Sequence, residues 1–344
     1  GCSVAARGSG EQMIDISVLI TNGVAALVGP SAIFFALLAI GLNIHFGYTG
    51  LLNFGQIGFA LVGGYGMGIA VLHYGLPLWV GALVGTLAGV VLALLLGIPT
   101  LRLRADYLAI VTIAAAEILR LITRSTSLTN LSGGTQGLTG YGEPFRELSP
   151  FDNGHFYSFF GVRFLGQDLW SICVGWTVVG LSLILVFLLV RSPWGRVLKA
   201  IREDEDAARA LGKNVFVYKM QALALGGVFG AVGGIVFALT TQSLTPDFYS
   251  PPQTFFAYAA LIIGGAGRVF GPVIGSMIFW FVLSVTDNFL RQATAGSNPL
   301  ISFIDNQDVG AIRFILVGVG LMLLMVFRPQ GIFGKRSEVL LDAR

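Results

Sequence analysis

The segment RSPWGRVLKAIREDEDAARALGKN, residues 191–214, lies between two long apolar stretches and carries six Lys or Arg and four Asp or Glu residues. Apolar stretches of about 20 residues are long enough to cross a bilayer as helices. A compact, charged and helix-forming segment between two such stretches is typical of a surface that a cytoplasmic partner binds. A solvated connector between two helices is the alternative interpretation.

The whole chain has the composition of a membrane protein. Of its 344 residues, 55% are apolar and 11% are charged, whereas soluble domains have about 25% charged residues. The 47 glycines fit the same class, because small residues let membrane helices approach closely. The basic residues cluster at the ends of apolar stretches, so no surface for nucleic acid is predicted. We expect an all-α, polytopic membrane protein without a sizeable soluble domain.

Apolar stretches bounded by Gly, Pro and charged residues predict eight to ten membrane-spanning helices. Glycine and proline near 29–30 suggest one kinked element there, and the glycines between 255 and 290 suggest two half-helices or a re-entrant hairpin. We expect a tail at 1–12, one transmembrane domain at 13–334 and a cytoplasmic tail at 335–344. The candidate stretches are 13–29, 31–47, 54–74, 78–98, 107–124, 169–190, 217–240, 255–267, 273–290 and 311–327.

The distribution of Lys and Arg predicts which side of the membrane each connection faces. The segment 191–214 has six basic residues, the tail 328–344 has four, and the short connection 99–106 has two. The long connection 125–168 has two basic residues against four acidic ones. The first three should therefore face the cytoplasm and 125–168 the outside, where 291–310 also falls.

Two Gly-dense segments give the two halves of the chain a loose likeness: GYTGLLNFGQIGFALVGGYGMG at 47–68 and LIIGGAGRVFGPVIGSMIF at 261–279. Transporters are often built from internal repeats whose interrupted helices mark the pathway. Tight helix packing also requires glycines. The sequence therefore leaves both the repeat and the packing interpretation open.

Few ionisable side chains lie inside the predicted spans. Glu117 and Arg120 are one helical turn apart, so we expect a structural ion pair. His45 is isolated and is expected to pack with hydrogen bonds, Cys173 should be a small core residue, and Asp287 lies near the outer end of a span. No group of residues has the spacing of a metal site, and no nucleophile is paired with a base. The sequence predicts no metal ion, cofactor or catalytic residue.

Residues 202–211 combine strong helix formers with acidic side chains toward the N-terminal part and a basic one toward the C-terminal part, which suits the helix dipole. Gly212 is placed to end this helix. A short helix with one apolar stripe and charged flanks is what a groove on a partner would bind. The stripe consists of Leu198, Ile201, Ala208 and Leu211.

The spacing of Asp206-Ala207-Ala208, three residues and then Gly212 resembles the Glu-Ala-Ala-x-x-x-Gly loop of bacterial ABC-importer permeases, with Asp in place of Glu. The Ile-x-Leu-Pro ending of that loop is absent, and 125–168 matches no pattern of the family. Sequence blocks spread over nearly the whole chain, between residues 42 and 334, are similar to the branched-chain amino-acid permease family. The similar blocks are LNIHFGYTGLLNFGQIGFALVGGYGMG, SPWGRVLKAIREDEDAARALGKNVFVYKMQAL, LIIGGAGRVFGPVIGSMI and FRPQGIFG.

The resemblance implies a permease subunit of an ATP-driven importer that moves Leu, Ile or Val across the bacterial inner membrane. The segment 191–214 would then hold the coupling helix, which seats in a cleft of a cytoplasmic ATPase. The implied partners are two such ATPases, a second permease subunit and an extracytoplasmic substrate-binding protein. The chain itself has no G-x-x-x-x-G-K-[ST] motif and should not hydrolyse ATP. The residues implied in ATPase coupling are Arg202, Glu205, Asp206, Ala207, Ala208, Leu211 and Gly212.

On this interpretation the interrupted helix at 47–68 is the candidate substrate pathway. Asn53 and Gln56 are polar groups in an apolar stretch, and a break in a helix offers hydrogen-bond partners to the carboxylate and ammonium of an amino acid. Apolar neighbours would supply the wall for an aliphatic side chain, and packing is the alternative role of all these residues. The candidate pathway residues are Asn53, Phe54, Gln56, Ile57, Phe59, Gly64, Gly264, Gly265 and Gly267.

Other functions stay open on the sequence alone. The same architecture would also import urea, short amides or other amino acids, and two copies of this chain would be an alternative to two different subunits. An ion-coupled secondary transporter would usually keep several carboxylates at mid-membrane, where only Glu117 is a candidate. An intramembrane enzyme would need a paired nucleophile and base, or a metal motif, inside the spans.

Overall fold

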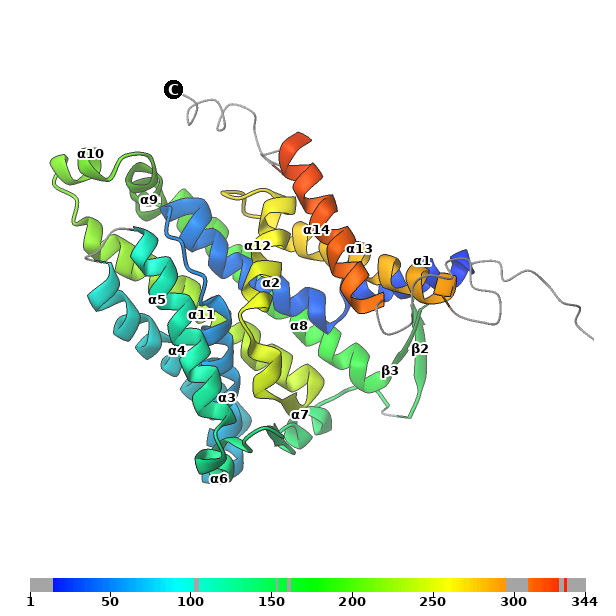
Figure 1. Ribbon diagram of the computed structural model, residues 1–344. Helices are drawn as coiled ribbons and strands as arrows, with labels where there is room; N and C mark the ends of the chain where they lie inside the picture. Colours follow the sequence, from blue (N-terminus) through cyan, green and yellow to red (C-terminus); the bar gives the residue numbers. More distant parts are fainter. Residues whose placement is uncertain are drawn as a thin grey trace, which may run out of the picture.

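The computed structural model describes residues 15–101, 105–152, 154–159, 162–294, 309–327 and 331–332. Within these residues the protein is all-α apart from two small two-stranded sheets (Figure 1). Each of the ten predicted apolar stretches overlaps one helix of at least 13 residues. These are α1 (Ile16–Val28), α2 (Pro30–Leu42), α3 (Gln56–Tyr74), α4 (Leu78–Thr100), α5 (Ala105–Arg124), α8 (Gly166–Arg191), α11 (Val215–Thr241), α12 (Pro252–Gly264), α13 (Gly271–Thr294) and α14 (Val309–Phe327).

The helices differ in how far they reach through a membrane. Six are long and apolar enough to cross it by length and composition: α2 with its continuation to Tyr48, α3, α4, α8, α11 and α13. In contrast, α1 and α12 are shorter apolar helices. The 13 residues of α12 extend about 20 Å at 1.5 Å per residue, less than the about 30 Å of a hydrocarbon core. The protein is a multi-pass membrane protein with full and partial spans.

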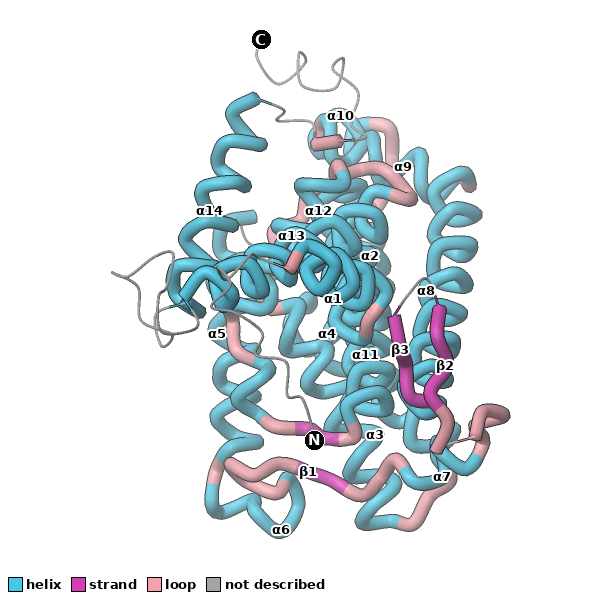
Figure 2. The backbone as a smooth tube through the Cα atoms, turned by 90° about the vertical axis from the view of Figure 1, so that its right-hand side faces the viewer, coloured by secondary structure: helices cyan, strands magenta, loops and turns pink. Residues whose placement is uncertain are grey.

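The helix α2 forms the centre of the molecule. Every residue from Ala32 to Leu42 is buried, because this helix is apolar on all sides and is covered by neighbours all round. The kink predicted near 29–30 is a break between two helices: Gly29 has extended backbone and Pro30 occupies the first position of α2, where its missing N–H costs nothing. Figure 2 shows α1 and α13 viewed nearly end-on, whereas α8 and α5 run vertically.

Close backbone approach holds α3 against α11. A Cβ atom on Gly63 would overlap the carbonyl oxygen of Ala231, and one on Gly234 would overlap the carbonyl oxygen of Ala60. Small residues at these two positions let the helices pack through their backbones, which is the usual way helices associate in a membrane. The packing interpretation of the glycines therefore holds at this contact.

The connection between α5 and α8 forms a short irregular cap at one end of the molecule. It contains the 3₁₀ turn Thr126–Leu128, α6 (Thr129–Ser132), β1 (Leu138–Thr139), α7 (Glu143–Glu147), β2 (Phe156–Phe159) and β3 (Val162–Leu165). β2 pairs with β3, and β1 pairs antiparallel with β4 (Ser243–Leu244), which precedes the 3₁₀ turn Pro246–Tyr249. At the opposite end lie α9 (Pro193–Glu203) and α10 (Glu205–Ala210) (Figure 1).

Ion pairs connect elements within and beside the helices. Arg120 Nη2 lies 2.6 Å from Glu117 Oε1, as predicted, and Arg120 Nη1 also lies 3.1 Å from Asp247 Oδ1. Asp287 Oδ1 lies 2.9 Å from Arg313 Nη1 on α14. This second pair joins α13 to α14 across more than twenty residues of sequence, which the sequence pattern did not predict.

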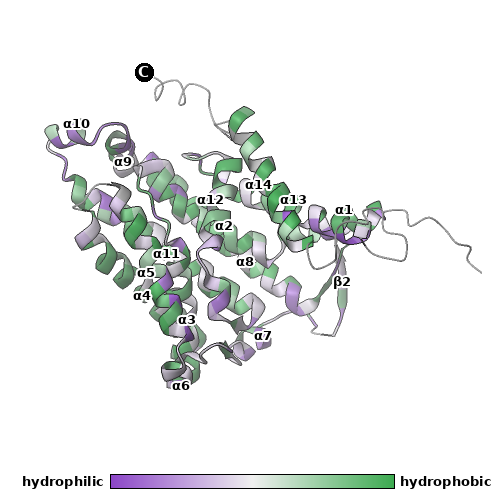
Figure 3. Ribbon diagram, viewed as in Figure 1, coloured by the Kyte–Doolittle hydropathy of each residue, from purple (hydrophilic) through white to green (hydrophobic). Residues whose placement is uncertain are grey.

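Hydrophobic residues run along most of the length of the outer helices (Figure 3). Leu181, Ile184 and Leu188 of α8 are 58–61% exposed, as expected for a helix that faces lipid. Cys173 of the same helix is also exposed. The expectation of a core cysteine was wrong, because an apolar stretch in a membrane protein does not distinguish a lipid-facing position from a buried one.

Candidate functional site

The charged segment forms two helices where one was predicted. α9 ends at Glu203, α10 begins at Glu205, and Asp204 between them has extended backbone with φ −154° and ψ 108°. The backbone N–H of Ala207 donates to Asp204 Oδ1 at 2.9 Å. Asp204 therefore caps the N-terminus of α10, a role for which Asp is among the preferred residues. The prediction over 202–211 missed this cap because it treated the acidic run as one helical turn.

The predicted apolar stripe divides between two faces. Leu198, Ile201 and Ala208 are buried, the last two against Val215 of α11. Leu211, in contrast, is 79% exposed at the tip of α10. Most of the stripe therefore packs on the protein itself, and a different set of residues faces outward. The exposed residues of α10 and its flanks include Glu203, Asp204, Asp206, Ala207, Arg209, Ala210 and Leu211.

Charged contacts fix α10 against the helix that follows it. Glu205 forms an ion pair with Lys219 of α11 and accepts a hydrogen bond from Arg209 Nη2 at 3.0 Å. Arg209 Nη1 donates to Asp206 at 2.8 Å. The chain then leaves α10 through Gly212, whose φ of 76° lies in the left-handed region. Gly212 ends the helix as predicted.

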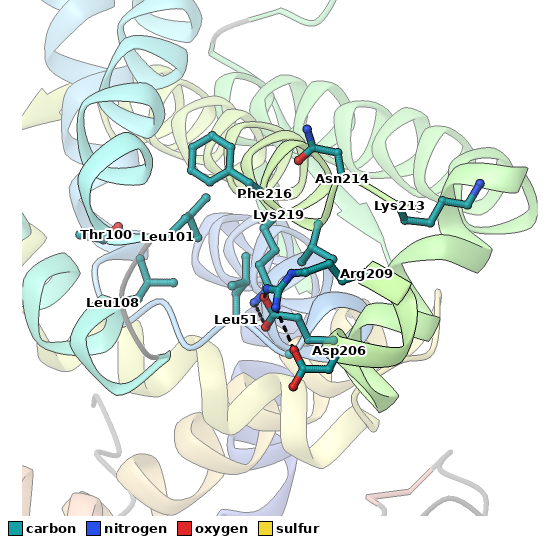
Figure 4. A pocket seen from close by; sticks show the side chains of 13 residues that line it. Leu51, Thr100, Leu101, Leu108, Asp206, Arg209, Lys213, Asn214, Phe216 and Lys219 are labelled. Atoms are coloured by element: carbon teal, nitrogen blue, oxygen red, sulfur yellow. Dashed lines mark hydrogen bonds and ion pairs between the residues drawn. The ribbon is translucent and has the colours of Figure 1, made fainter. Parts of the chain in front are cut away.

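A cavity of about 740 Å³ lies beneath α10 (Figure 4). One wall is apolar and includes Leu51, Leu101 and Leu108. The other wall is charged and includes Arg209 and Lys219. The cavity therefore separates α10 from the chain that enters α3.

Residues 43–55, between the end of α2 and the start of α3, form an interruption that we call the first helix break. The chain continues from α2 as a π-helical segment, Asn43–Tyr48, and turns at Gly50, whose φ is 76°. The α-helix resumes at Gln56. Four polar side chains of this region are at most 1% exposed: Asn43, His45, Asn53 and Gln56. A buried polar group is costly unless it is hydrogen-bonded, so each of them needs a partner inside the protein.

A chain of hydrogen bonds satisfies three of these side chains. His45 Nε2 lies 3.1 Å from the carbonyl oxygen of Leu223, which only accepts, so Nε2 carries the proton. Nδ1 of the neutral ring then accepts from Asn53 Nδ2 at 3.2 Å. The second N–H of this amide donates to Gln56 Oε1 at 3.0 Å, and Gln56 Nε2 donates to the carbonyl of Gly226 at 2.9 Å. The chain begins and ends on α11.

Neighbouring helices satisfy the backbone of the first break. The Tyr258 hydroxyl accepts from the N–H of Asn53 at 3.2 Å and donates to its carbonyl at 3.0 Å. The N–H of Phe54 donates to Thr112 Oγ1 at 3.1 Å, and the N–H of Ile57 donates to Thr254 Oγ1 at 3.1 Å. These N–H groups at the start of α3 have no partner within the helix. α5 and α12 supply the partners, and no pattern in the sequence predicts them.

The predicted pathway residues lie in different surroundings. Asn53, Gln56, Ile57 and Phe59 are fully buried, and Asn53 and Gln56 share the hydrogen-bond chain. Phe54 is half-buried, its ring 5.5 Å from that of Phe255 and 5.3 Å from that of Tyr258. A Cβ atom on Gly64 would lie 2.9 Å from Leu244 Cδ2, which places this glycine near β4 and away from the break. The role of these residues in a pathway stays a prediction.

The second break, residues 264–271, lies beside the first. Gly265 and Gly267 have φ of 98° and 76°. Asn43 Oδ1 accepts from the N–H of Gly267 at 2.8 Å, and Asn43 Nδ2 donates to the carbonyl of Arg268 at 2.8 Å. One side chain of the first break therefore holds the backbone of the second, although more than 220 residues separate them.

Arg202 connects the charged segment to both breaks. Its Nη1 donates to the carbonyl of Gly47 at 2.6 Å. The same nitrogen would lie 3.5 Å from a Cβ atom on Gly267. A displacement of α9 would therefore act directly on the backbone at which both interrupted helices meet.

Several curated permease proteins are similar to this chain over most of its length. The high-affinity branched-chain amino acid transport system permease protein LivM of Salmonella typhimurium strain LT2 is 29% identical over 314 residues, 89% of this chain and 69% of the relative. The probable LivM permease of Methanocaldococcus jannaschii is 23% identical, over 88% of this chain and 91% of the relative. The guanosine ABC transporter permease NupQ of Bacillus subtilis strain 168 is 25% identical, over 67% of this chain and 76% of the relative.

One protein family covers nearly the whole chain. It is described as branched-chain amino acid transport system / permease component, and it matches residues 26–326. The match includes both helix breaks, the charged segment and the long helices from α2 to α14 apart from Phe327, but only residues 26–28 of α1. This chain belongs to the permease component family of branched-chain amino acid transport systems.

Proposed function

We propose that this chain is a membrane subunit of an ATP-driven importer of Leu, Ile and Val in a bacterial inner membrane. Its family, and the LivM relatives aligned over most of its length, support the assignment. The partners are two cytoplasmic ATPases, which hydrolyse the ATP, a second and different permease subunit, and an extracytoplasmic substrate-binding protein. The α9–α10 end faces the cytoplasm and the 125–168 cap faces outward, as the distribution of Lys and Arg indicates.

The proposed mechanism depends on one observation: the charged segment with the exposed helix α10 is connected through Arg202 to the buried first break. In our proposal the exposed residues of α10, with Leu211 at the tip, contact the ATPase. Ala208 instead packs α10 against Ile201 and Val215 of the same chain. Arg202 and Glu205 then transmit the movement, the first to the Gly47 carbonyl and the second to α11. ATP-driven closure of the two ATPases would move both coupling segments together.

We place the substrate pathway along the first break, on the side where Phe54 and Phe255 lie. Phe255 is 48% exposed and Phe54 packs on it, so an apolar wall reaches the surface directly beside the hydrogen-bond chain. Asn53 and Gln56 have internal hydrogen-bond partners on both the oxygen and the nitrogen of their amides. A zwitterionic substrate would therefore compete for these amides when the break opens, and closure would restore the internal hydrogen bonds.

Uptake by the assembled system tests the substrate. The chain is expressed with its ATPases, second permease and binding protein in cells without their own leucine uptake, and radiolabelled leucine, guanosine and urea are supplied separately. We expect uptake of leucine alone. Uptake of guanosine or urea without leucine would overturn the amino-acid assignment, and leucine uptake by the purified chain alone, driven by an ion gradient, would overturn the ATP-driven class.

A substitution at the tip of α10 tests the ATPase contact. Leu211→Glu should leave insertion unchanged, because this side chain is exposed, and should lower co-purification of the ATPase about tenfold, as for a central interface residue. Leu148→Glu is the matched control, since Leu148 is 68% exposed at the opposite end. Equal co-purification for both variants would show that α10 is only a connector. Ala208→Glu is less informative, because it would disturb the buried seat of α10.

A further inference from the structure

A basic pocket lies on the other side of α9 from the cavity of Figure 4. It has a volume of about 620 Å³ and lies between the end of α8, α9 and the second break. Four of its lining residues are cationic: Arg191, Arg196, Lys199 and Arg268. None of the described lining residues is acidic. The pocket thus concentrates positive charge at the end of the helix bundle.

Two cationic side chains of the pocket contact aromatic rings, and its three cations on α8 and α9 are not neutralised by a carboxylate in the described part of the chain. The Arg191 guanidinium lies 4.0 Å above the ring of Phe187, and Lys199 Nζ lies 5.8 Å from the ring of Tyr48. Arg191, Arg196 and Lys199 form no ion pair with a carboxylate in the described part of the chain. A multivalent anion in the pocket would supply the missing countercharge.

The approach to the pocket is apolar. Ile184 and Leu188 of α8 are 58% and 60% exposed. Ile184, Phe187, Leu188 and Arg191 follow the i, i+3, i+4, i+7 spacing of one helix face. Phe270, on the opposite rim, is 58% exposed. A ligand that fits both parts has an anionic group for the pocket and a long apolar chain for the α8 surface. This is the chemistry of a phospholipid rather than of a free anion.

We propose that this pocket binds the phosphate-bearing head group of an anionic phospholipid, whose acyl chains lie along the exposed face of α8. Basic pockets between membrane helices at the interface are known to hold such head groups. The bound lipid contacts α9 and the Gly267–Phe270 loop together. It therefore holds the start of the charged segment against the second helix break.

Lipid binding to the purified full-length chain tests this site. Delipidated protein is titrated with phosphatidylglycerol, and bound lipid is counted by native mass spectrometry. The double variant Arg196→Gln/Lys199→Gln should bind phosphatidylglycerol about tenfold more weakly, since each interfacial cation contributes on the order of a few-fold to tenfold in affinity. Both side chains are exposed, so the fold should persist, and an unchanged thermal unfolding midpoint checks this.

A charge-matched variant separates the pocket from the general charge of this end. Arg209→Gln/Lys213→Gln removes the same two charges from the α10 side of α9 and should bind phosphatidylglycerol like the wild type. Equal weakening in both double variants would overturn the site. Unchanged binding in Arg196→Gln/Lys199→Gln, with loss of ATPase co-purification, would also overturn it and assign the basic pocket to a protein contact.

Two further ligands identify the source of the phosphate. Phosphatidylcholine, which has the same acyl chains but no net charge, should bind more weakly and equally in all variants. Inorganic phosphate alone should leave the unfolding midpoint unchanged. Stabilisation by inorganic phosphate equal to that by phosphatidylglycerol, lost in Arg196→Gln/Lys199→Gln, would support a phosphate site and overturn its assignment to a lipid.

Discussion

The two helix breaks are both rich in glycine but are stabilised in different ways. In the first break, side chains supply the partners: His45, Asn53 and Gln56 form a hydrogen-bond chain between two carbonyls of α11. The second break depends more on backbone geometry: Gly265 and Gly267 have positive φ and Gly264 packs against Gly271. Its side-chain hydrogen bonds come from Asn43 of the first break. Glycine density in a membrane sequence therefore marks a break without revealing whether side chains or backbone geometry hold it.

The largest effect is expected in the second break. A Cβ atom on Gly264 would overlap the carbonyl oxygen of Gly271, so Gly264→Ala should separate α12 from α13 at a cost above about 3 kcal/mol. We expect little folded protein by size-exclusion chromatography in detergent. Gly180→Ala is the matched control, because nothing lies within 4 Å of a Cβ atom there. Normal yields of Gly264→Ala would show that this break tolerates side chains.

A smaller effect is expected when the hydrogen-bond chain is cut in the first break. Asn53→Leu keeps the number and branching of the side-chain heavy atoms but leaves His45 Nδ1, Gln56 Oε1 and the N–H of Gly55 without their partner. The variant should lose about 2 kcal/mol of unfolding free energy, measured by denaturant titration in mixed micelles. Asn130→Leu, at an exposed position, should lose little. Equal stability of the two variants would contradict a structural role for the chain.

Cutting the link between the charged segment and the breaks should affect transport more than stability. Arg202→Gln removes the hydrogen bond to the Gly47 carbonyl. In the assembled system, substrate moved per ATP hydrolysed should fall about fivefold, which corresponds to about 1 kcal/mol of lost coupling. Arg146→Gln, at the opposite end, should keep the wild-type ratio. A wild-type ratio in Arg202→Gln would mean that the movement reaches the breaks by another route.

The smallest effect is expected for backbone strain alone. Gly50 of the first break has φ 76°, and the nearest atom to a Cβ there is Arg202 Cγ at 3.4 Å, an ordinary contact. Gly50→Ala should therefore cost only the about 1 kcal/mol of left-handed backbone. Gly75 also has a left-handed backbone, with φ 61°, and nothing lies within 4 Å of a Cβ atom there. Gly75→Ala should therefore lower the unfolding midpoint by the same amount as Gly50→Ala. A much larger loss for Gly50→Ala would show that the turn at Gly50 has no room for a side chain.

Local features of the fold were predictable. Each apolar stretch became a helix, Gly212 ended α10, and Glu117 paired with Arg120. Each feature depends on residues within a few positions of one another, or on a continuous apolar length, so the pattern in the sequence is sufficient. The cap at Asp204 is also local, and the preference of Asp for helix N-termini is the signal that would have identified it.

Contacts between distant segments were not predictable. Tyr258 lies 205 residues from Asn53, and Thr254 lies 197 residues from Ile57. A Tyr or Thr in a membrane helix has the same local pattern whether it packs on lipid, on a neighbour or on a break. The burial of Ala208 and the exposure of Leu211 depend in the same way on where α11 lies relative to α10.

By itself, the sequence determined the membrane class, the positions of the helices and the charged segment, because hydrophobic length and charge act locally on each stretch of chain. Only the tertiary structure decided which face of α10 points outward, which groups satisfy the broken helices and that the two breaks meet at Asn43 and Arg202. The physical reason is that a buried polar group takes whichever partner the packing of distant helices brings within hydrogen-bonding distance.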